Sequence, residues 1–236
     1  MVVMTTSASA GVLLIGASRG LGLALAAEWA SRGRPVVATV RGSARTPLHD
    51  LADRSDGAVE VEHVDVTVPE QVTALAARLA TRRFEILFVN AGVTNEPEGT
   101  VAETSTEEFV RVMVTNALSP LRVVEALAHL VTPDGTIGVM SSGQGSVANN
   151  ETGGHEVYRG SKAALNTFVR SYAARHRDDH RSLVLMAPGW VRTDLGGDDA
   201  RLGIDESIPG VVATIDALRT SPGLHYVDYA GRTVPW

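Results

Sequence analysis

The chain has 236 residues, a length that suits one domain with one hydrophobic core. It carries 21 Lys and Arg residues against 27 Asp and Glu residues, so its formal net charge is −6. This balance excludes a protein that binds nucleic acid through bulk positive charge. The sequence holds no cysteine, which excludes disulfides, Cys-ligated zinc and a thiol nucleophile, and its scattered histidines predict no metal site.

No stretch of the chain approaches the ~18 consecutive apolar residues of a membrane-spanning helix. Residues 1–10 are small and polar and lack the basic segment that opens a secretory signal peptide. We therefore expect a cytoplasmic protein that has no membrane partner.

Short apolar runs alternate with longer amphipathic stretches from one end of the chain to the other. In chain order, the pattern predicts a strand at 12–15, a helix at 20–31, strands at 36–40 and 59–64, a helix at 69–81, a strand at 86–89, a helix at 106–131, a strand at 137–140, a helix at 156–175, a strand at 183–186, a helix at 204–219 and a strand at 224–229. Runs of Val, Ile and Leu without polar alternation are typical of strands buried on both faces of a parallel sheet. The sequence therefore predicts an α/β chain, a single-domain Rossmann fold over 1–236 with a doubly wound, mostly parallel seven-stranded sheet and helices on both faces.

Three stretches carry little periodicity, and each follows directly after a predicted strand: residues 94–103, 143–155 and 193–205. In open α/β sheets, ligands bind in the crevice outside the carboxyl ends of the strands. We expect these three loops to form the substrate pocket.

The segment between the first strand and the first helix is rich in glycine. Its candidate phosphate-binding residues are Gly16, Ser18, Arg19, Gly20, Leu21 and Gly22. Glycines let the backbone turn sharply and approach a pyrophosphate, whose charge is met by the free N–H groups of the helix start. The spacing is G-x-x-x-G-x-G, and no Gly-Lys-Ser/Thr follows, so the segment predicts a dinucleotide site rather than a P-loop.

Arg41 stands at the end of the second strand, where a site that prefers NAD carries Asp or Glu. A carboxylate there would repel a 2′-phosphate, whereas a guanidinium binds phosphate with matching geometry. Arg19 offers a second charge to the same phosphate, and Arg45 is a weaker third candidate. The sequence therefore predicts NADP(H) in preference to NAD(H).

Tyr158 and Lys162 are four residues apart at the start of a predicted helix, so both side chains lie on one helical face. A phenol is a weak acid at neutral pH, and a neighbouring cation lowers its pKa toward the working range. The pair is a candidate for proton transfer.

With these motifs in place, the chain resembles the short-chain dehydrogenase/reductase family over nearly its whole length. The matching pieces occur in the family's order: Gly16 to Gly22, Asp65-Val66, Asn90-Ala91-Gly92, Asn116, Ser141-Ser142, Tyr158 to Lys162, and Pro188-Gly189 followed by Thr193. Segments 140–146, 158–166, 188–197 and 226–236 more narrowly resemble the branch of sniffer-type carbonyl reductases and C-factor-like proteins.

The resemblance implies a catalytic tetrad of Asn116, Ser142, Tyr158 and Lys162. It also implies cofactor contacts by Asp65 and Val66 at the adenine, by Asn90, Ala91 and Gly92 beside the central sheet, and by Pro188, Gly189, Val191 and Thr193 near the nicotinamide.

Two departures from the family pattern stand out. Ile15 occupies the place where the family commonly has Thr before its first glycine, which weakens the expected support of the turn. The interval from Ser142 to Tyr158 is long, and this leaves open whether Ser141 or Ser142 is the catalytic serine.

These features predict an NADP(H)-dependent oxidoreductase that moves a hydride between nicotinamide and a carbonyl or secondary alcohol, with Tyr158 as acid and base. The alternative is an NAD(P)-binding regulatory protein, similar to C-factor, with little catalysis. A sugar-nucleotide epimerase is disfavoured, because the segment after Pro188 is too short for a larger substrate domain. The three loops hold few cations, which favours a small neutral substrate, and the resemblance implies a homodimer or homotetramer through the helices at 106–131 and 156–175.

Overall fold

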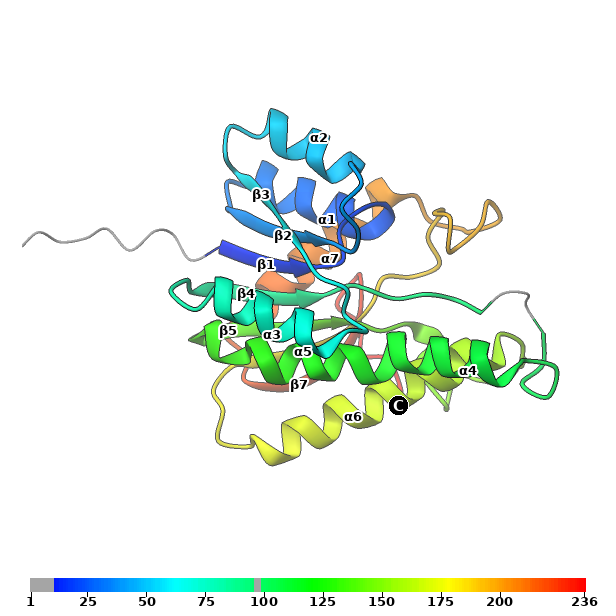
Figure 1. The fold of residues 1–236 in the computed structure, drawn as a ribbon. Helices are drawn as coiled ribbons and strands as arrows, with labels where there is room; N and C mark the ends of the chain where they lie inside the picture. The colour runs from blue at the N-terminus through cyan, green and yellow to red at the C-terminus, as the bar shows by residue number, and fades with distance from the viewer. Residues whose placement is uncertain (1–10, 96–98) are drawn as a thin grey trace, which may run out of the picture.

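The computed structural model describes residues 11–95 and 99–236. Its strands are Gly11–Ile15 (β1), Val36–Val40 (β2), Val59–His63 (β3), Phe84–Val89 (β4), Val131–Met140 (β5), Ser182–Ala187 (β6) and Gly223–Asp228 (β7). Its α-helices are Gly20–Ser31 (α1), Pro47–Arg54 (α2), Pro69–Arg78 (α3), Thr106–Met113 (α4), Ser119–Leu127 (α5), Glu156–Arg175 (α6) and Ile204–Leu218 (α7). The strands form one sheet in the order β3-β2-β1-β4-β5-β6-β7, and all neighbouring strands are parallel (Figure 1). The predicted doubly wound Rossmann fold is confirmed.

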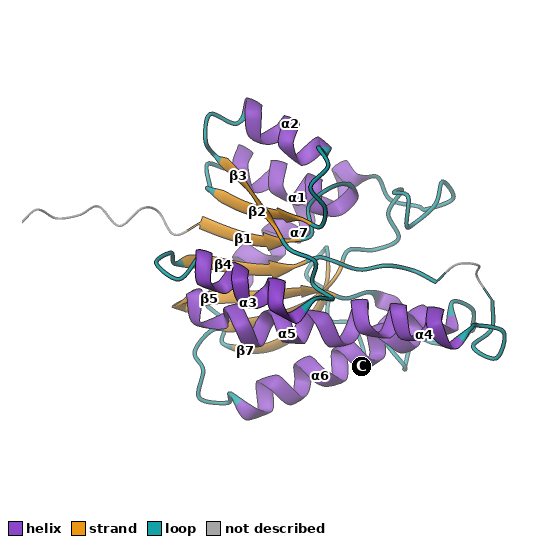
Figure 2. Cartoon of the chain, viewed as in Figure 1, coloured by secondary structure: helices purple, strands orange, loops and turns teal. Residues whose placement is uncertain are grey.

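Both faces of the sheet are buried, each under its own layer of helices (Figure 2). Successive residues of β1 point to opposite faces: Leu13 and Ile15 join one core with α3, α5 and α6, whereas Val12 and Leu14 join the other with α1 and α7. Since apolar side chains are needed on both faces, the central strands show no polar alternation.

The strand order reverses between β1 and β4. The chain first builds outward from β1 through β2 to β3, and then returns to place β4 on the other side of β1. Ile15 and Val89, at the ends of these two strands, are in register. The glycine turn after β1 and the segment that follows β4 therefore meet at the topological switch point, where such sheets bind ligands.

The helix expected over 106–131 is wrong as a single element. A π-helical turn, Val114–Leu118, separates α4 from α5, and a 3₁₀ turn, Ala128–Leu130, leads directly into β5. Pro120 has no N–H to donate to the carbonyl four residues earlier, so a regular α-helix cannot continue through Asn116. β5 begins at Val131, six residues before the expected strand at 137–140.

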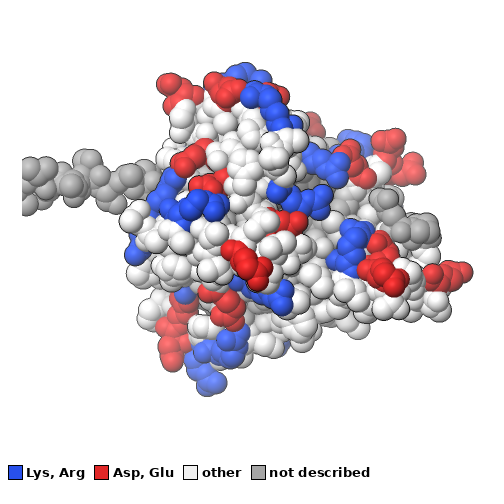
Figure 3. All heavy atoms as spheres, viewed as in Figure 1, with Lys and Arg blue, Asp and Glu red and all other residues white. Residues whose placement is uncertain are grey.

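Acidic and basic side chains are interspersed on the face of the molecule seen in Figure 3. Several form ion pairs, such as Arg78 with Glu62 at 2.9 Å. Within residues 11–95 and 99–236, no helix is long and apolar enough to cross a bilayer.

Candidate active site

A cleft of about 1630 Å³ opens at the carboxyl ends of the strands. Eighteen of the sequence-predicted site residues line it: Gly16, Ser18, Arg19, Gly20, Leu21, Arg41, Asp65, Val66, Asn90, Ala91, Gly92, Ser142, Tyr158, Lys162, Pro188, Gly189, Val191 and Thr193. The other two predicted residues, Gly22 and Asn116, are buried and lie behind its wall. The structure thus brings together residues spread over most of the chain.

The glycine turn is held by one side chain from β2 and one from the residue that follows β4. Gly16 has φ +89°, its N–H donates to the Thr39 hydroxyl at 2.9 Å, and its carbonyl accepts from Asn90 Nδ2 at 2.7 Å. A Cβ at Gly22 would lie 2.1 Å from the Gly16 carbonyl oxygen. The turn therefore keeps its shape although Ile15 replaces the family's threonine.

The start of α1 is suited to an anion. No side chain caps its N-terminus, and its first turn holds no acidic residue. Its free N–H groups and the positive end of the helix dipole therefore face the cleft, the arrangement that binds phosphate.

The three candidate arginines differ in their surroundings. Arg41 follows β2, lines the cleft, is exposed and has no ion-pair partner among the described residues. Arg19 also lines the cleft, but it forms an exposed ion pair with Asp194 at 2.9 Å. Arg45 lies outside the cleft wall and is bound by Asp50 and Asp53. Arg41 is thus the cation best placed to meet a ligand's phosphate, and Arg45 is not available to one.

Tyr158, Ser142 and Lys162 converge on one side of the cleft. Tyr158 and Lys162 lie on the first two turns of α6, with Lys162 Nζ 5.8 Å from the centroid of the phenol ring. The Lys162 ammonium donates to the carbonyl of Met140 at 2.9 Å. Lys162 is also the single lysine of the chain, against twenty arginines.

Burial dominates the pKa values of this pair. It raises the pKa of Tyr158, and a hydrogen bond with the Ser142 side chain lowers that pKa by less. Burial also lowers the pKa of Lys162 to about 8. The net direction is therefore opposite to the lowered Tyr158 pKa expected from Lys162, because desolvation of the phenolate outweighs the effect of the Ser142 side chain. Tyr158 is protonated at neutral pH and can donate a proton.

Asn116 lies in the π-helical turn and is fully buried. Its Nδ2 donates to the Val93 carbonyl at 2.8 Å and to the Ser161 hydroxyl at 2.9 Å, and its Oδ1 accepts from the Val93 N–H at 2.9 Å. A Cβ at Gly92 would lie 3.4 Å from Asn116 Oδ1 and 3.5 Å from Lys162 Nζ. Asn116 thus joins the segment after β4 to the start of α6, directly beside Lys162.

The two adjacent serines face different partners. Ser141 is buried, and its hydroxyl donates to Asn166 Oδ1 at 2.6 Å. Ser142 Oγ accepts from the Gln144 N–H at 3.1 Å, and the Ser142 side chain acts to lower the pKa of Tyr158. In this geometry Ser142 is the serine that stands beside the phenol.

The expected pocket loops contribute unequally to the cleft. Seven residues of segment 143–155 and six of segment 193–205 line the cleft. Among the described residues of segment 94–103, Thr94 alone lines it, and residues 96–98 lie outside the described part of the chain. A further part of the wall, which was not predicted, comes from the end of β7 and the residues that follow it: Asp228, Tyr229, Arg232, Thr233, Val234 and Pro235. The signal was available, since the carboxyl ends of all parallel strands meet at one edge of a sheet.

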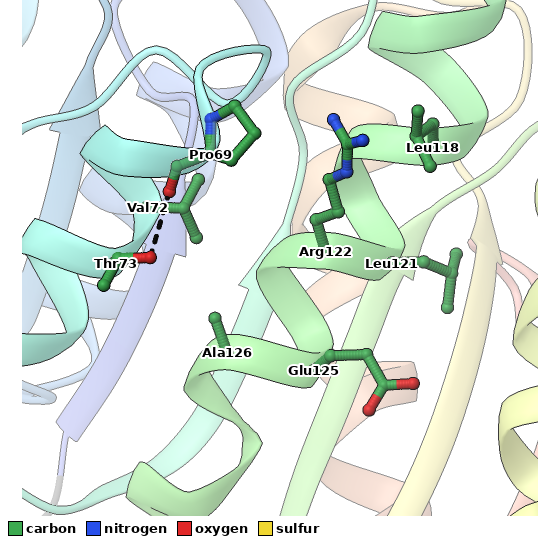
Figure 4. A pocket seen from close by; sticks show the side chains of 8 residues that line it. All are labelled: Pro69, Val72, Thr73, Leu118, Leu121, Arg122, Glu125 and Ala126. Atoms are coloured by element: carbon green, nitrogen blue, oxygen red, sulfur yellow. Dashed lines mark hydrogen bonds between the residues drawn. The ribbon is translucent and has the colours of Figure 1, made fainter.

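A second cavity, of about 490 Å³, lies between α3 and α5 (Figure 4). Its walls are largely apolar, with Arg122 and Glu125 as its charged side chains. It contains no pair of acid and base comparable to Tyr158 and Lys162. Within the described residues, no cluster of His, Asp and Glu could hold a metal ion.

Comparisons with known proteins agree with this geometry. A family model described as Enoyl-(Acyl carrier protein) reductase matches residues 16–207. A putative short-chain dehydrogenase/reductase from Burkholderia multivorans, crystallised with bound NADP, is 61% identical, with 97% of this chain and 100% of that chain covered and a TM-score of 0.95.

Two further relatives match the expected branch. A carbonyl reductase from Pseudomonas aeruginosa PAO1 in complex with NADP is 36% identical, covers 97% of this chain and 100% of its own, and has a TM-score of 0.89. The C-signal protein of Myxococcus xanthus is 36% identical over 165 residues, which are 69% of this chain and 99% of that protein. The resemblance to carbonyl reductases and C-factor-like proteins is thus confirmed, and the chain belongs to the short-chain dehydrogenase/reductase family of oxidoreductases.

Proposed function

We propose that this protein is an NADP(H)-dependent oxidoreductase that transfers a hydride between nicotinamide and a carbonyl or secondary alcohol. The observation that carries the proposal is the grouping of Tyr158, Ser142 and Lys162 in the cleft onto which the glycine turn opens. The NADP bound to the relatives from B. multivorans and P. aeruginosa supports the choice of cofactor.

The cleft residues fit a dinucleotide phosphate. The backbone N–H groups at the start of α1 would hold the pyrophosphate, and Arg41 would bind the 2′-phosphate. Asp65 and Val66 line the adenine end; the Asp65 carboxylate is oriented by the Thr67 N–H at 2.9 Å and hydroxyl at 2.7 Å. Pro188, Gly189, Val191 and Thr193 line the opposite end.

When bound, the nicotinamide supplies or accepts the hydride. In the reducing direction, the Tyr158 hydroxyl, which is protonated at neutral pH, donates a proton to the carbonyl oxygen. Ser142 Oγ accepts from Gln144, so its own proton is free to stabilise the charge that develops on that oxygen. Lys162 brings a positive charge beside Tyr158, and Asn116 holds the backbone next to Lys162.

The test is to follow the absorbance of NADPH with a panel of neutral ketones and aldehydes. Tyr158→Phe should reduce turnover by about 10²–10⁴-fold, the range for removal of a general acid. Tyr172→Phe is the matched control, because Tyr172 is a second buried tyrosine of α6 that lies outside the cleft wall. Turnover that survives in Tyr158→Phe would refute the assignment.

A regulatory NAD(P)-binding protein with little catalysis is the second candidate, and the match to C-signal favours it. This function requires tight cofactor binding without turnover of any carbonyl in the panel. Turnover that is lost in Tyr158→Phe therefore decides against it.

We propose further that the substrate is small and neutral, and that the protein is a cytoplasmic homodimer or homotetramer. Exposed apolar side chains on α4 and α6, namely Phe109, Val110 and Phe168, support an interface on these helices. Light scattering after size exclusion tests the assembly, and Phe109→Glu with Phe168→Glu should yield monomers.

A further inference from the structure

The backbone that carries Ser142 lies beyond the end of β5, where the sheet no longer supplies hydrogen bonds to both sides. We propose that Tyr226, together with Asn166, is a positioning residue that fixes the Ser142 backbone so that its hydroxyl meets Tyr158. This inference rests on the proposed function, and it assigns a role to a residue of β7 that does not itself line the cleft.

The contacts form a continuous clamp on the segment from Met140 to Gly145. The Tyr226 hydroxyl donates to the carbonyl of Ser142 at 2.5 Å. The Ser141 hydroxyl donates to Asn166 Oδ1 at 2.6 Å, and Asn166 Nδ2 donates to the Gly145 carbonyl at 3.2 Å. Since Lys162 already holds the Met140 carbonyl at 2.9 Å, each of these bonds limits rotation of the same short segment.

The clamp is buried and closely packed. Tyr226 is 2% exposed and Asn166 is 3% exposed. A Cβ at Gly145 would lie 2.9 Å from Lys162 Cβ and 3.0 Å from Asn166 Nδ2, so the turn after Ser142 lies directly against α6. A buried hydroxyl or amide that loses its partner is costly, which makes the network strongly prefer one arrangement.

The ring of Tyr226 is itself held in place, so its hydroxyl has a defined direction. Trp236 packs on it with a centroid distance of 5.4 Å, and the Arg170 guanidinium lies 4.6 Å from the centroid of the Trp236 ring. The Trp236 carbonyl accepts from the Ala148 N–H at 3.0 Å, which ties the same unit to the 143–155 loop. Tyr226 therefore approaches Ser142 as a rigid donor.

Packing alone does not require this hydroxyl, because phenylalanine fills nearly the same space. Tyr226→Phe should therefore leave the fold intact, remove one of the two hydrogen bonds to the Ser142 carbonyl, so that only the bond from the Gly145 N–H at 2.9 Å remains, and shift the Ser142 hydroxyl relative to Tyr158. Tyr172→Phe removes a hydroxyl from another buried tyrosine, one that stacks on His176 at 4.1 Å, and serves as the control.

The first experiment needs no turnover. The chain has four tyrosines, so labelling of the ζ carbon gives four NMR signals that single substitutions can assign. Because the Ser142 side chain influences the Tyr158 phenol, Tyr226→Phe should move the Tyr158 signal, whereas Tyr172→Phe should not. An unmoved Tyr158 signal in Tyr226→Phe would overturn the proposal, whatever the activity of the protein.

The second experiment is a kinetic cycle with Ser142→Ala. Tyr226→Phe should lower kcat by about tenfold, the rate equivalent of one hydrogen bond, with KM and the Kd of NADPH unchanged. In the Ser142→Ala background it should cause no further loss, because Tyr226 acts through Ser142. An equal loss in both backgrounds would mean a general structural effect and would overturn the proposal.

Asn166→Ala provides a second variant if Tyr226→Phe does not fold. It frees both the Ser141 hydroxyl and the Gly145 carbonyl, and it should displace the Tyr158 signal in the same direction. An unmoved signal in this variant would again contradict the clamp. Loss of turnover in Tyr158→Phe tests the proposed function separately, so the two inferences can fail independently.

Discussion

The single lysine of the chain allows the electrostatics of the site to be measured directly. Burial lowers the pKa of Lys162 from 10.5 to about 8, so the folded protein releases this proton more readily than the unfolded chain does. Below pH 8 the ammonium is charged in both states, and folding bears the full cost of burying it. Between pH 8 and 10.5 the Lys162 amine is neutral in the folded protein but still protonated in the unfolded chain, so the free energy of unfolding rises with pH.

The size of the effect follows from this difference. A shift of ~2.5 pKa units corresponds to about 3 kcal/mol at 1.36 kcal/mol per unit. Raising the pH from 7 to 9.5 recovers about 2 kcal/mol of this cost, because the cost is fully recovered only once the pH passes the unfolded pKa. The free energy of unfolding of the wild type should therefore rise by about 2 kcal/mol relative to Lys162→Met, which keeps the length of the side chain but has no charge.

Two measurements check this prediction. Lysine labelled with ¹³C at the ε carbon gives one resonance, which Lys162→Met must remove and whose titration should have its midpoint near pH 8. Urea unfolding of both proteins at pH 7 and pH 9.5 then measures the change in their stability difference. A midpoint near 10.5, or a stability difference independent of pH, would show that the Lys162 ammonium is well solvated and that the argument from burial is wrong.

Three further substitutions test the phosphate end of the cleft. Arg41→Asp should reverse the preference from NADPH toward NADH by about tenfold or more, since a carboxylate repels the 2′-phosphate; an unchanged ratio of the two Kd values would refute the role of Arg41. Asp194→Asn should strengthen NADPH binding about two- to fivefold and leave NADH binding unchanged, because it releases Arg19 from an exposed ion pair worth up to ~1 kcal/mol; equal effects on both cofactors would contradict this account. Gly22→Ala should abolish tight NADPH binding, because its Cβ would lie 2.1 Å from the Gly16 carbonyl oxygen. Gly160→Ala, whose Cβ meets no atom within 4 Å, should instead raise the melting temperature slightly. NADPH titration and thermal unfolding of both variants distinguish the two effects.

Local signals in the sequence were sufficient for the sheet and for the place of the glycine turn in the cleft wall. The apolar strand β1 is buried on both faces, and the glycine turn follows it directly, so sequence neighbours are also neighbours in space. The π-helical turn at Asn116 was not predicted although Pro120 offered a local signal for it, whereas the bonds of the Asn116 side chain to Val93, 23 residues earlier in the chain, have no local signal. The ion pair of Arg19 could not be predicted either, because its partner Asp194 is 175 residues away in the chain.

The direction of the Tyr158 pKa shift shows a second kind of limit. Helical spacing alone places a cation beside the phenol and predicts a lower pKa. Burial acts in the opposite direction and prevails, and burial is a property of the whole fold rather than of the motif. Spacing along the helix can thus identify a candidate pair for proton transfer, but the packed structure sets the direction in which each pKa moves.

A common construction principle runs through the site. At the carboxyl edge of the sheet, side chains from other elements add hydrogen bonds to backbone groups at or just beyond the strand ends. Thr39 and Asn90 hold Gly16, and Lys162 holds Met140. Because these polar side chains stabilise loops rather than the core, their substitution should cost activity more than stability. Buried polar residues at this edge are therefore the places where positioning roles, such as that of Tyr226, should be sought.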